Sequence, residues 1–233
     1  MNSLFSYDSP MMQILMYIGD LIILNFLYLI CCIPVFTIGA AQAGLYTAIR
    51  VLNDKEDDSS AAAAFFRGFK NGFGTVTIAW GLLAVLFAVV ALAALFATIL
   101  GLPLWLCILP LCILAVFMSL VPAFHSRFGC TVTQLYRNTF LLLIAHPLRS
   151  IAAAALMWVP VVVMACLDMF NSMATSLVWL TIYFSTAVLF GELFLRKPFK
   201  TLVDHYNETQ AENAPEALPE DKPEKIFSDT PTN

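Results

Sequence analysis

Two long stretches without formal charge constrain this chain more than any other feature. Between Lys70 and Arg127 no Asp, Glu, Lys or Arg occurs. Between Arg149 and Glu192 the one such residue is Asp168. A membrane-spanning helix needs about 20 apolar residues, so each stretch is long enough for two spans. Because 60% of residues are hydrophobic and 12% are charged, against roughly 45–50% and about 25% in soluble proteins, we expect an integral membrane protein.

The apolar segments predict an all-α fold, a polytopic transmembrane helical bundle of about five spans. The spans are expected near residues 12–33, 76–100, 103–124, 151–167 and 175–195. The segment 35–52 is apolar enough for a short sixth span or a re-entrant helix, and both alternatives stay open. We therefore expect a transmembrane helical domain over residues 1–203 with short interfacial helices, and a disordered acidic cytoplasmic tail at 204–233.

The cations all fall on the same side of the five predicted spans. They follow the first span, lie between the third and fourth, and follow the fifth, and these groups hold all 12 Lys and Arg residues. The positive-inside rule then predicts a multi-pass plasma-membrane protein with the N-terminus outside and the C-terminus in the cytoplasm. Nothing basic precedes the first apolar run, which contains Asp20, so we expect this span to remain and not to be cleaved as a signal peptide.

The stretch CCIPVFTIGAAQAGLY ends the first span and starts a new helix. Pro34 lacks an amide donor and disfavours helix at the preceding residue, and Thr37 is placed to act as the N-cap of the new helix. Ala40, Gly44 and Ala48 recur every four residues, which gives a smooth face for close helix approach. This helix either seals the bundle or is a re-entrant element that lines a polar path.

Two segments between spans predict additional short helices. In AAAAFFRGFKNGF, the side chains of Phe65, Phe69 and Phe73 share one helical stripe, which favours an interfacial helix on anionic lipid; a groove on a partner protein fits the same pattern. Its GxxxG lies in a charged segment and is weak evidence for helix dimerisation. In TVTQLYRNTFLLLIAHPL a helix is expected over 133–145. We interpret its Arg137 as a topology anchor, with a ligand role as the alternative.

Polar residues inside the apolar segments are costly and are therefore candidates for function. Asp20 is the one formal charge of the first span. Three roles are open for Asp20. It forms a structural hydrogen bond, for example with Tyr17, it takes part in transport of a solute or proton, or it lies at the membrane interface. Asn25 lies on a different helical face. Glu192 and Arg196 have the i, i+4 spacing of a local ion pair.

Composition also argues against several classes of function. The six cysteines show no CxxC spacing and the three histidines are scattered, so neither a metal site nor a cofactor is expected. The net charge of −4 is set largely by the C-terminal residues, and nucleic acid is not implied. No nucleophile–base arrangement or phosphate-binding glycine loop is apparent, so the protein is not expected to be an enzyme.

Asn25 in the first span, IPVFTIGAAQAGLY, FFRGFKNGF and RNTFLLLIAHP together resemble the bacterial YesL-like family of integral membrane proteins, a domain of unknown function. The resemblance covers about residues 15–206 and is most specific at Pro34, Thr37, Ile38, Gly39 and Ala40. Members are typically encoded beside carbohydrate ABC-transporter parts and polysaccharide-degrading enzymes. The resemblance therefore implies a plasma-membrane protein tied to carbohydrate uptake or utilisation, and it brings no established catalytic or binding residues.

The leading hypothesis is a non-enzymatic accessory protein that contacts the lipid bilayer and either ABC-type sugar permease subunits or further copies of itself. The alternative is a small solute permease or channel in its own right, which uses the broken helix after Pro34 and the carboxyl group of Asp20. A third hypothesis, an intramembrane enzyme, requires a catalytic group such as His146 or Glu192.

Overall fold

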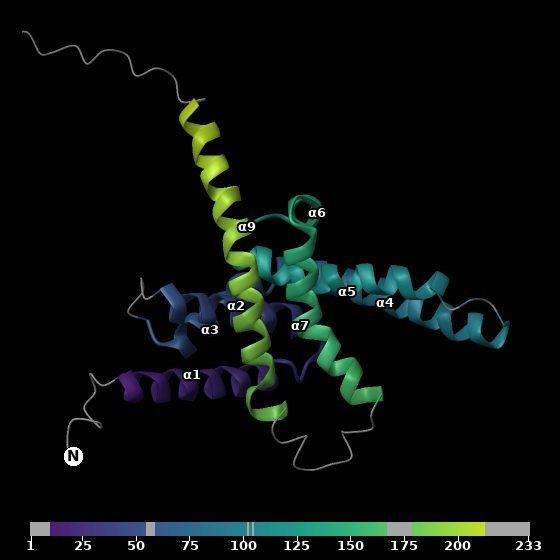
Figure 1. Cartoon of the computed structure of the whole chain (residues 1–233), viewed down its shortest axis with the longest axis horizontal. Helices are drawn as coiled ribbons and strands as arrows, with labels where there is room; N and C mark the ends of the chain where they lie inside the picture. Colours follow the sequence, from purple (N-terminus) through teal and green to yellow (C-terminus); the bar gives the residue numbers. More distant parts are fainter. Residues whose placement is uncertain (1–9, 55–58, 102, 104, 167–178, 213–233) are drawn as a thin grey trace, which may run out of the picture. The chain divides into compact units, whose positions relative to one another are not determined.

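The computed structural model describes residues 10–54, 59–101, 103, 105–166 and 179–212 (Figure 1). Within these ranges the chain is helical and has no strand, which confirms the predicted all-α fold. The elements in chain order are α1 (Pro10–Cys31), the 3₁₀ turn η1 (Val35–Thr37), α2 (Ile38–Asp54), α3 (Ala61–Gly72), α4 (Thr75–Ile99), α5 (Trp105–His125), α6 (Val132–Ala145), α7 (Pro147–Cys166), the π-helical turn η3 (Trp179–Tyr183) and α9 (Phe184–Glu212).

Several of the described helices are long and apolar enough to cross a membrane. Four qualify alone, over Met11–Cys31, Val35–Asp54, Thr75–Ile99 and Cys107–His125. The pair α6 and α7 qualifies as a fifth, but the two helices meet at a bend of 111°. The segment 35–52, for which the sequence left two alternatives, is therefore part of a helical segment long enough to cross a membrane. The predicted spans 151–167 and 175–195 fall on α7 and on η3 with α9, while residues 167–178 lie outside the described residues.

The helices differ greatly in how much of their surface is covered. In the most apolar stretch of the α2 segment 67% of the residues are buried, whereas in that of α4 11% are buried. α4 runs beside α5 as a helical hairpin (Figure 1), and most of its large side chains are exposed. A membrane would cover those side chains with lipid. α2 is thus the central helix, and α4 is a peripheral one.

The chain divides into two compact units, Met1–Pro198 and Phe199–Asn233. The helices from α1 to α7 all belong to the first unit. α9 stays helical to Glu212, so the structure differs from the predicted disordered tail over residues 204–212. The physical reason is that no proline occurs there before Pro215 and most of these residues tolerate a helix. The rest of the predicted tail, 213–233, lies outside the described residues.

The small face of α2 packs directly against the backbone of α3. A Cβ atom added at Gly44 would lie 2.8 Å from the carbonyl oxygen of Phe65 and 3.1 Å from the amide nitrogen of Phe69. A Cβ atom at Gly68 would lie 3.0 Å from Cα of Gly44. The GxxxG of α3, given little weight from its charged surroundings, is therefore the surface that receives α2.

This crossing changes the interpretation of the phenylalanine stripe. Phe65 is fully buried, whereas Phe73 is 46% exposed. The rings of Phe65 and Phe69 stack with centroids 6.3 Å apart. Phe65 is therefore covered by protein and not by lipid, whereas Phe73 stays exposed, and the interfacial position of α3 stays a prediction. The first ring of the stripe belongs to the protein core.

The bend between α1 and α2 is closed by a hydroxyl group. Pro34 follows the end of α1, where the last carbonyl groups have no intrahelical partner. The hydroxyl of Thr37 lies 2.5 Å from the carbonyl oxygen of Cys31 and 2.6 Å from that of Pro34. Thr37 stands directly before α2, as an N-cap would, but its hydroxyl donates backwards and ties the start of α2 to the end of α1.

A proline in α7 creates a contact with the turn before α9. Pro160 has no N–H, so the carbonyl of Leu156, four residues earlier, loses its helical partner. The hydroxyl of Tyr183 lies 2.9 Å from this carbonyl oxygen and 2.9 Å from that of Met157. The bond satisfies a carbonyl that the proline leaves exposed, and it fixes the π-helical turn against α7.

Candidate functional site: an aromatic cavity between the helices

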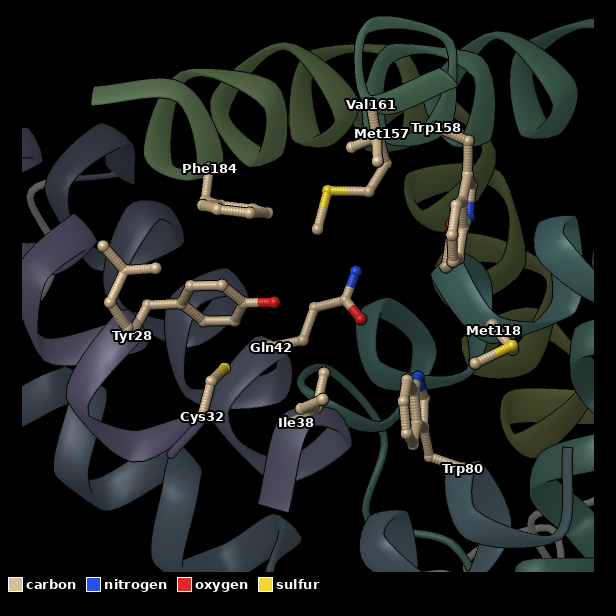
Figure 2. A pocket seen from close by; sticks show the side chains of 12 residues that line it. Tyr28, Cys32, Ile38, Gln42, Trp80, Met118, Met157, Trp158, Val161 and Phe184 are labelled. Atoms are coloured by element: carbon tan, nitrogen blue, oxygen red, sulfur yellow. The ribbon is translucent and has the colours of Figure 1, made fainter. Parts of the chain in front are cut away.

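A cavity of about 290 Å³ lies between α1, α2, α4, α5, α7 and the start of α9 (Figure 2). Its lining is almost entirely apolar, and four of these helices contribute aromatic rings to it: Tyr28, Trp80, Trp158 and Phe184. Met118 and Met157 fill two further sides. Thioether and aromatic side chains adapt well to apolar ligands, so the lining suits a small, mostly apolar molecule.

Gln42 is the main polar feature of this cavity. The residue is 3% exposed, and its carboxamide points into the middle of the cavity (Figure 2). Among the residues that the structure describes, none forms a hydrogen bond with this side chain. Buried polar groups in native proteins nearly always have a partner. The amide of Gln42 therefore offers a donor and an acceptor to a molecule bound in the cavity.

Two other polar groups of the lining, on Trp158 and Ser119, are occupied by the protein itself. The indole Nε1 of Trp158 donates to the hydroxyl oxygen of Ser119 at 2.8 Å and to the carbonyl oxygen of Ala115 at 2.9 Å. Ser119 in turn donates to Ala115 at 3.1 Å. These bonds fix the plane of the indole ring, which is thereby held ready to stack on a ligand.

Tyr28 is fixed in a similar way on the opposite side of the cavity. Its ring centroid lies 5.0 Å from that of Phe184, and the residue is 4% exposed. In Figure 2 the Tyr28 hydroxyl points toward Gln42. A carboxamide binds donors and acceptors but does not transfer protons under ordinary conditions. The arrangement of neutral groups therefore suits recognition of a ligand.

The small-residue positions predicted from sequence surround this site without lining it. Gly39 packs against α4, where an added Cβ atom would lie 2.5 Å from Cβ of Trp80. Ala40 and Ala48 are fully buried, and Gly44 contacts α3. Of this helix, Ile38 and Gln42 face the cavity.

The two polar residues predicted in the first span lie in different environments. Asn25 is fully buried, and its Oδ1 accepts a hydrogen bond from the backbone N–H of Ser185 at 3.2 Å. That N–H follows the π-helical turn, where the regular bonding pattern of a helix is interrupted. Asp20 is half-buried. The hydroxyl of Tyr17 donates to Asn53 at 2.9 Å and not to Asp20.

The predicted local pair of Glu192 and Arg196 is wrong. Glu192 is buried and forms an ion pair with Arg127, which the sequence places 65 residues away. Arg196 pairs instead with Asp54 at 2.6 Å. Helix spacing permits an i, i+4 pair, but tertiary partners compete for the same groups.

The remaining candidates, Arg137 and His146, do not line the aromatic cavity. Arg137 is exposed on α6. His146 ends α6 at the 111° bend, where its backbone N–H donates to the carbonyl oxygen of Leu142 at 3.0 Å. These two positions, with Glu192, are not brought together at one site by any described contact.

Sequence reasoning missed the residues that define the cavity. Gln42 had a usable signal, since it is the one amide in the run IGAAQAGLYTAI of small and apolar residues. Trp80 and Trp158 gave no such signal in the sequence, because an aromatic residue in a membrane span can face lipid as well as a cavity. Only the arrangement of the helices brings these rings to face one another.

Comparison with known proteins agrees with the sequence resemblance at a coarse level. The family described as "Protein of unknown function, DUF624" matches residues 21–94. This match is consistent with the YesL-like resemblance and covers α2 and α3 together with half of α1 and most of α4. No curated protein and no solved structure matches the chain. The segment with family similarity thus includes the elbow, the α2–α3 crossing and Gln42.

Proposed function

We propose that this protein is a non-enzymatic accessory protein of the membrane, which binds a small, mostly apolar molecule in the aromatic cavity. The observation that carries the proposal is the buried carboxamide of Gln42, which faces the cavity and has no hydrogen-bond partner among the described residues. A ligand with one polar group would satisfy this amide, while its apolar part would contact the rings of Trp80 and Trp158.

The link to carbohydrate uptake rests on the YesL-like resemblance. The cavity itself does not favour a sugar as ligand, because each buried sugar hydroxyl would need a hydrogen-bond partner and the lining offers mainly Gln42 for this purpose. In the proposed division of roles, a partner permease recognises the carbohydrate, and the cavity binds a different, apolar molecule.

The proposed setting is the plasma membrane, with the C-terminus in the cytoplasm. The positive-inside rule supports this orientation. The gathering of Arg50, Arg67 and Arg127 around one cavity also supports it, since these residues come from two of the cation groups that the sequence predicts on the same side. The proposed partners are ABC-type sugar permease subunits or further copies of this chain.

The accessory role is tested by purifying the tagged protein from its native membrane in nanodiscs and identifying co-purified proteins by mass spectrometry, with an untagged control. Reproducible recovery of ABC permease subunits is the expected result. Recovery of only this chain, together with sugar movement into liposomes that contain the purified protein alone, would instead favour the solute permease.

The ligand-binding role is tested by native mass spectrometry of the same nanodisc preparation. We expect an adduct on the wild-type protein that is lost in Gln42→Leu. Gln13→Leu is the matched control, because it makes the same chemical change at an exposed position of α1 that does not line the cavity. An adduct that survives in Gln42→Leu, or that is lost equally in both variants, would contradict the assignment of the ligand to this cavity.

A further inference from the structure

A second cavity, of about 250 Å³, differs from the first in being polar. It lies between α2, α3 and the turn that follows α5. Three guanidinium groups contribute to its lining, together with other polar side chains: Arg50, Arg67, Arg127, Thr47, Asn71 and His125. None of the residues of the aromatic cavity takes part, so the two cavities are separate sites.

Two of the three arginines are held in place by other parts of the protein. The Nη1 of Arg50 donates to the backbone carbonyl oxygen of Ser126 at 2.8 Å, which connects α2 to the turn after α5. Arg127 lies one residue further along that turn, and its side chain is 17% exposed. Its ion pair with the buried carboxylate of Glu192 orients the guanidinium. These groups are therefore fixed before any ligand arrives.

The third arginine and an amide lie at the rim of the cavity. Arg67 and Asn71 are exposed and are four residues apart on α3, so their side chains share one face of the helix. The close crossing of α2 and α3 at Gly44 and Gly68 brings this face beside Arg50. The crossing therefore places cationic side chains from two helices around one cavity.

The lining of this cavity contains three guanidinium groups and, among the described residues, no carboxylate. The carboxylate of Glu192 pairs with Arg127 from outside the lining, and the nearby carboxylate of Asp54 is paired with Arg196. The lining is therefore cationic, although Glu192 offsets part of the charge of Arg127 and Asp54 part of the charge of Arg50 and Arg127. Burial lowers the pKa of Arg127 to about 10, and the positive charge of Arg50 contributes further to this lowering. A bound anion would relieve the repulsion between these cations.

We propose that this cavity binds a phosphate group, carried either by a lipid headgroup or by a free phosphorylated molecule. A phosphate monoester carries about −1.5 to −2 charge at pH 7, which suits a lining of several arginines without an acid. The planar fork of an arginine pairs with phosphate oxygens through two parallel hydrogen bonds. The Asn71 amide supplies a further donor. In the proposed orientation the site opens toward the cytoplasm.

The test measures the stabilisation of the full chain by inorganic phosphate, in nanodiscs made of phosphatidylcholine alone and at constant ionic strength set with sodium chloride. We expect phosphate to raise the unfolding temperature of the wild type in a saturable way. In Arg67→Gln the apparent Kd should rise about tenfold or more. Lys70→Gln is the matched control, because it removes one exposed charge from the same helix outside the cavity, and its Kd should stay within about twofold.

A second variant keeps the test independent of Arg67. Arg50→Lys retains the positive charge but loses the planar fork, so it should weaken phosphate binding while the protein still inserts and purifies. The proposal is overturned if phosphate stabilises the wild type no more than chloride does. It is also overturned if Lys70→Gln weakens binding as much as Arg67→Gln, because binding would then reflect surface charge alone.

The same preparation distinguishes the two sources of the phosphate group. Nanodiscs that contain phosphatidic acid are compared with the phosphatidylcholine discs. If the lipid abolishes the response to added phosphate in the wild type, the site takes a lipid headgroup. If the response to phosphate is unchanged, the site takes a free phosphorylated molecule. Either result supports the site, and neither depends on the ligand of the aromatic cavity.

Discussion

The crossing of α2 and α3 predicts a specific and measurable effect of adding one methyl group at Gly44. The added Cβ atom would lie 2.8 Å from the carbonyl oxygen of Phe65, whereas a carbon–oxygen contact normally needs about 3.3 Å or more. The helices must therefore separate by about 0.5 Å. Because the obstacle is backbone, no side chain rotation relieves it. Overpacking of this kind typically costs about 1–3 kcal/mol.

The matched control is Gly81→Ala on α4, where an added Cβ atom has nothing within 4 Å. Both variants replace a glycine inside a helix by alanine, and this change favours the helix by about 1 kcal/mol. That gain cancels when the two variants are compared. The difference between them therefore isolates the packing cost of about 1–3 kcal/mol at the α2–α3 crossing.

Thermal unfolding in detergent, followed by the circular dichroism of the helices, measures this difference. For a chain of this size about 1 kcal/mol corresponds to roughly 2–4 °C, so Gly44→Ala should unfold roughly 2–12 °C below Gly81→Ala. Equal unfolding temperatures for the two variants would refute the close crossing. A temperature for Gly44→Ala above that of Gly81→Ala would refute it more strongly.

Three further substitutions probe polar side chains one at a time. Tyr183→Phe removes the donor to the carbonyl of Leu156 and should cost about 0.6–2 kcal/mol, measured as a lower unfolding temperature in detergent; an unchanged temperature would contradict the contact. Asn25→Leu leaves the buried N–H of Ser185 without its acceptor and should destabilise by about 1–3 kcal/mol, which reduces the amount of folded protein in the membrane; full abundance would count against this bond. Asp20→Asn should change stability by less than about 0.5 kcal/mol and leave the cavity adduct in native mass spectra, and loss of that adduct would point to a role for this carboxyl in binding.

Much of the architecture was predictable, because a long apolar segment is stable in lipid and therefore marks a membrane-spanning helix. Charge-free stretches predicted the positions of α4 and α5, and Pro34 predicted the break between α1 and α2. Small residues at a spacing of four predicted a face for close helix approach. These inferences depend on one segment at a time, and a single sequence contains the information that they need.

Pairings between distant segments were not predictable in the same way. Glu192 has a suitable cation, Arg196, four residues away. It nevertheless pairs with Arg127, because the turn after α5 places Arg127 beside the buried carboxylate of Glu192. Phe65 has the pattern of a lipid-facing residue, yet α2 covers it. Gln42 was visible as an unusual residue in the sequence, but only the meeting of six helices around it shows that its amide has no hydrogen-bond partner among the described residues. Such properties belong to the tertiary arrangement.

The central helix lines both cavities, since Gln42 belongs to the aromatic one and Arg50 to the cationic one. At 1.5 Å per residue these positions are about 12 Å apart along α2. If the ligand proposed for one cavity shifts α2 along its axis, the geometry of the other cavity changes with it. Thermodynamic linkage then requires the effect to be reciprocal: each proposed ligand would change the affinity for the other by the same factor.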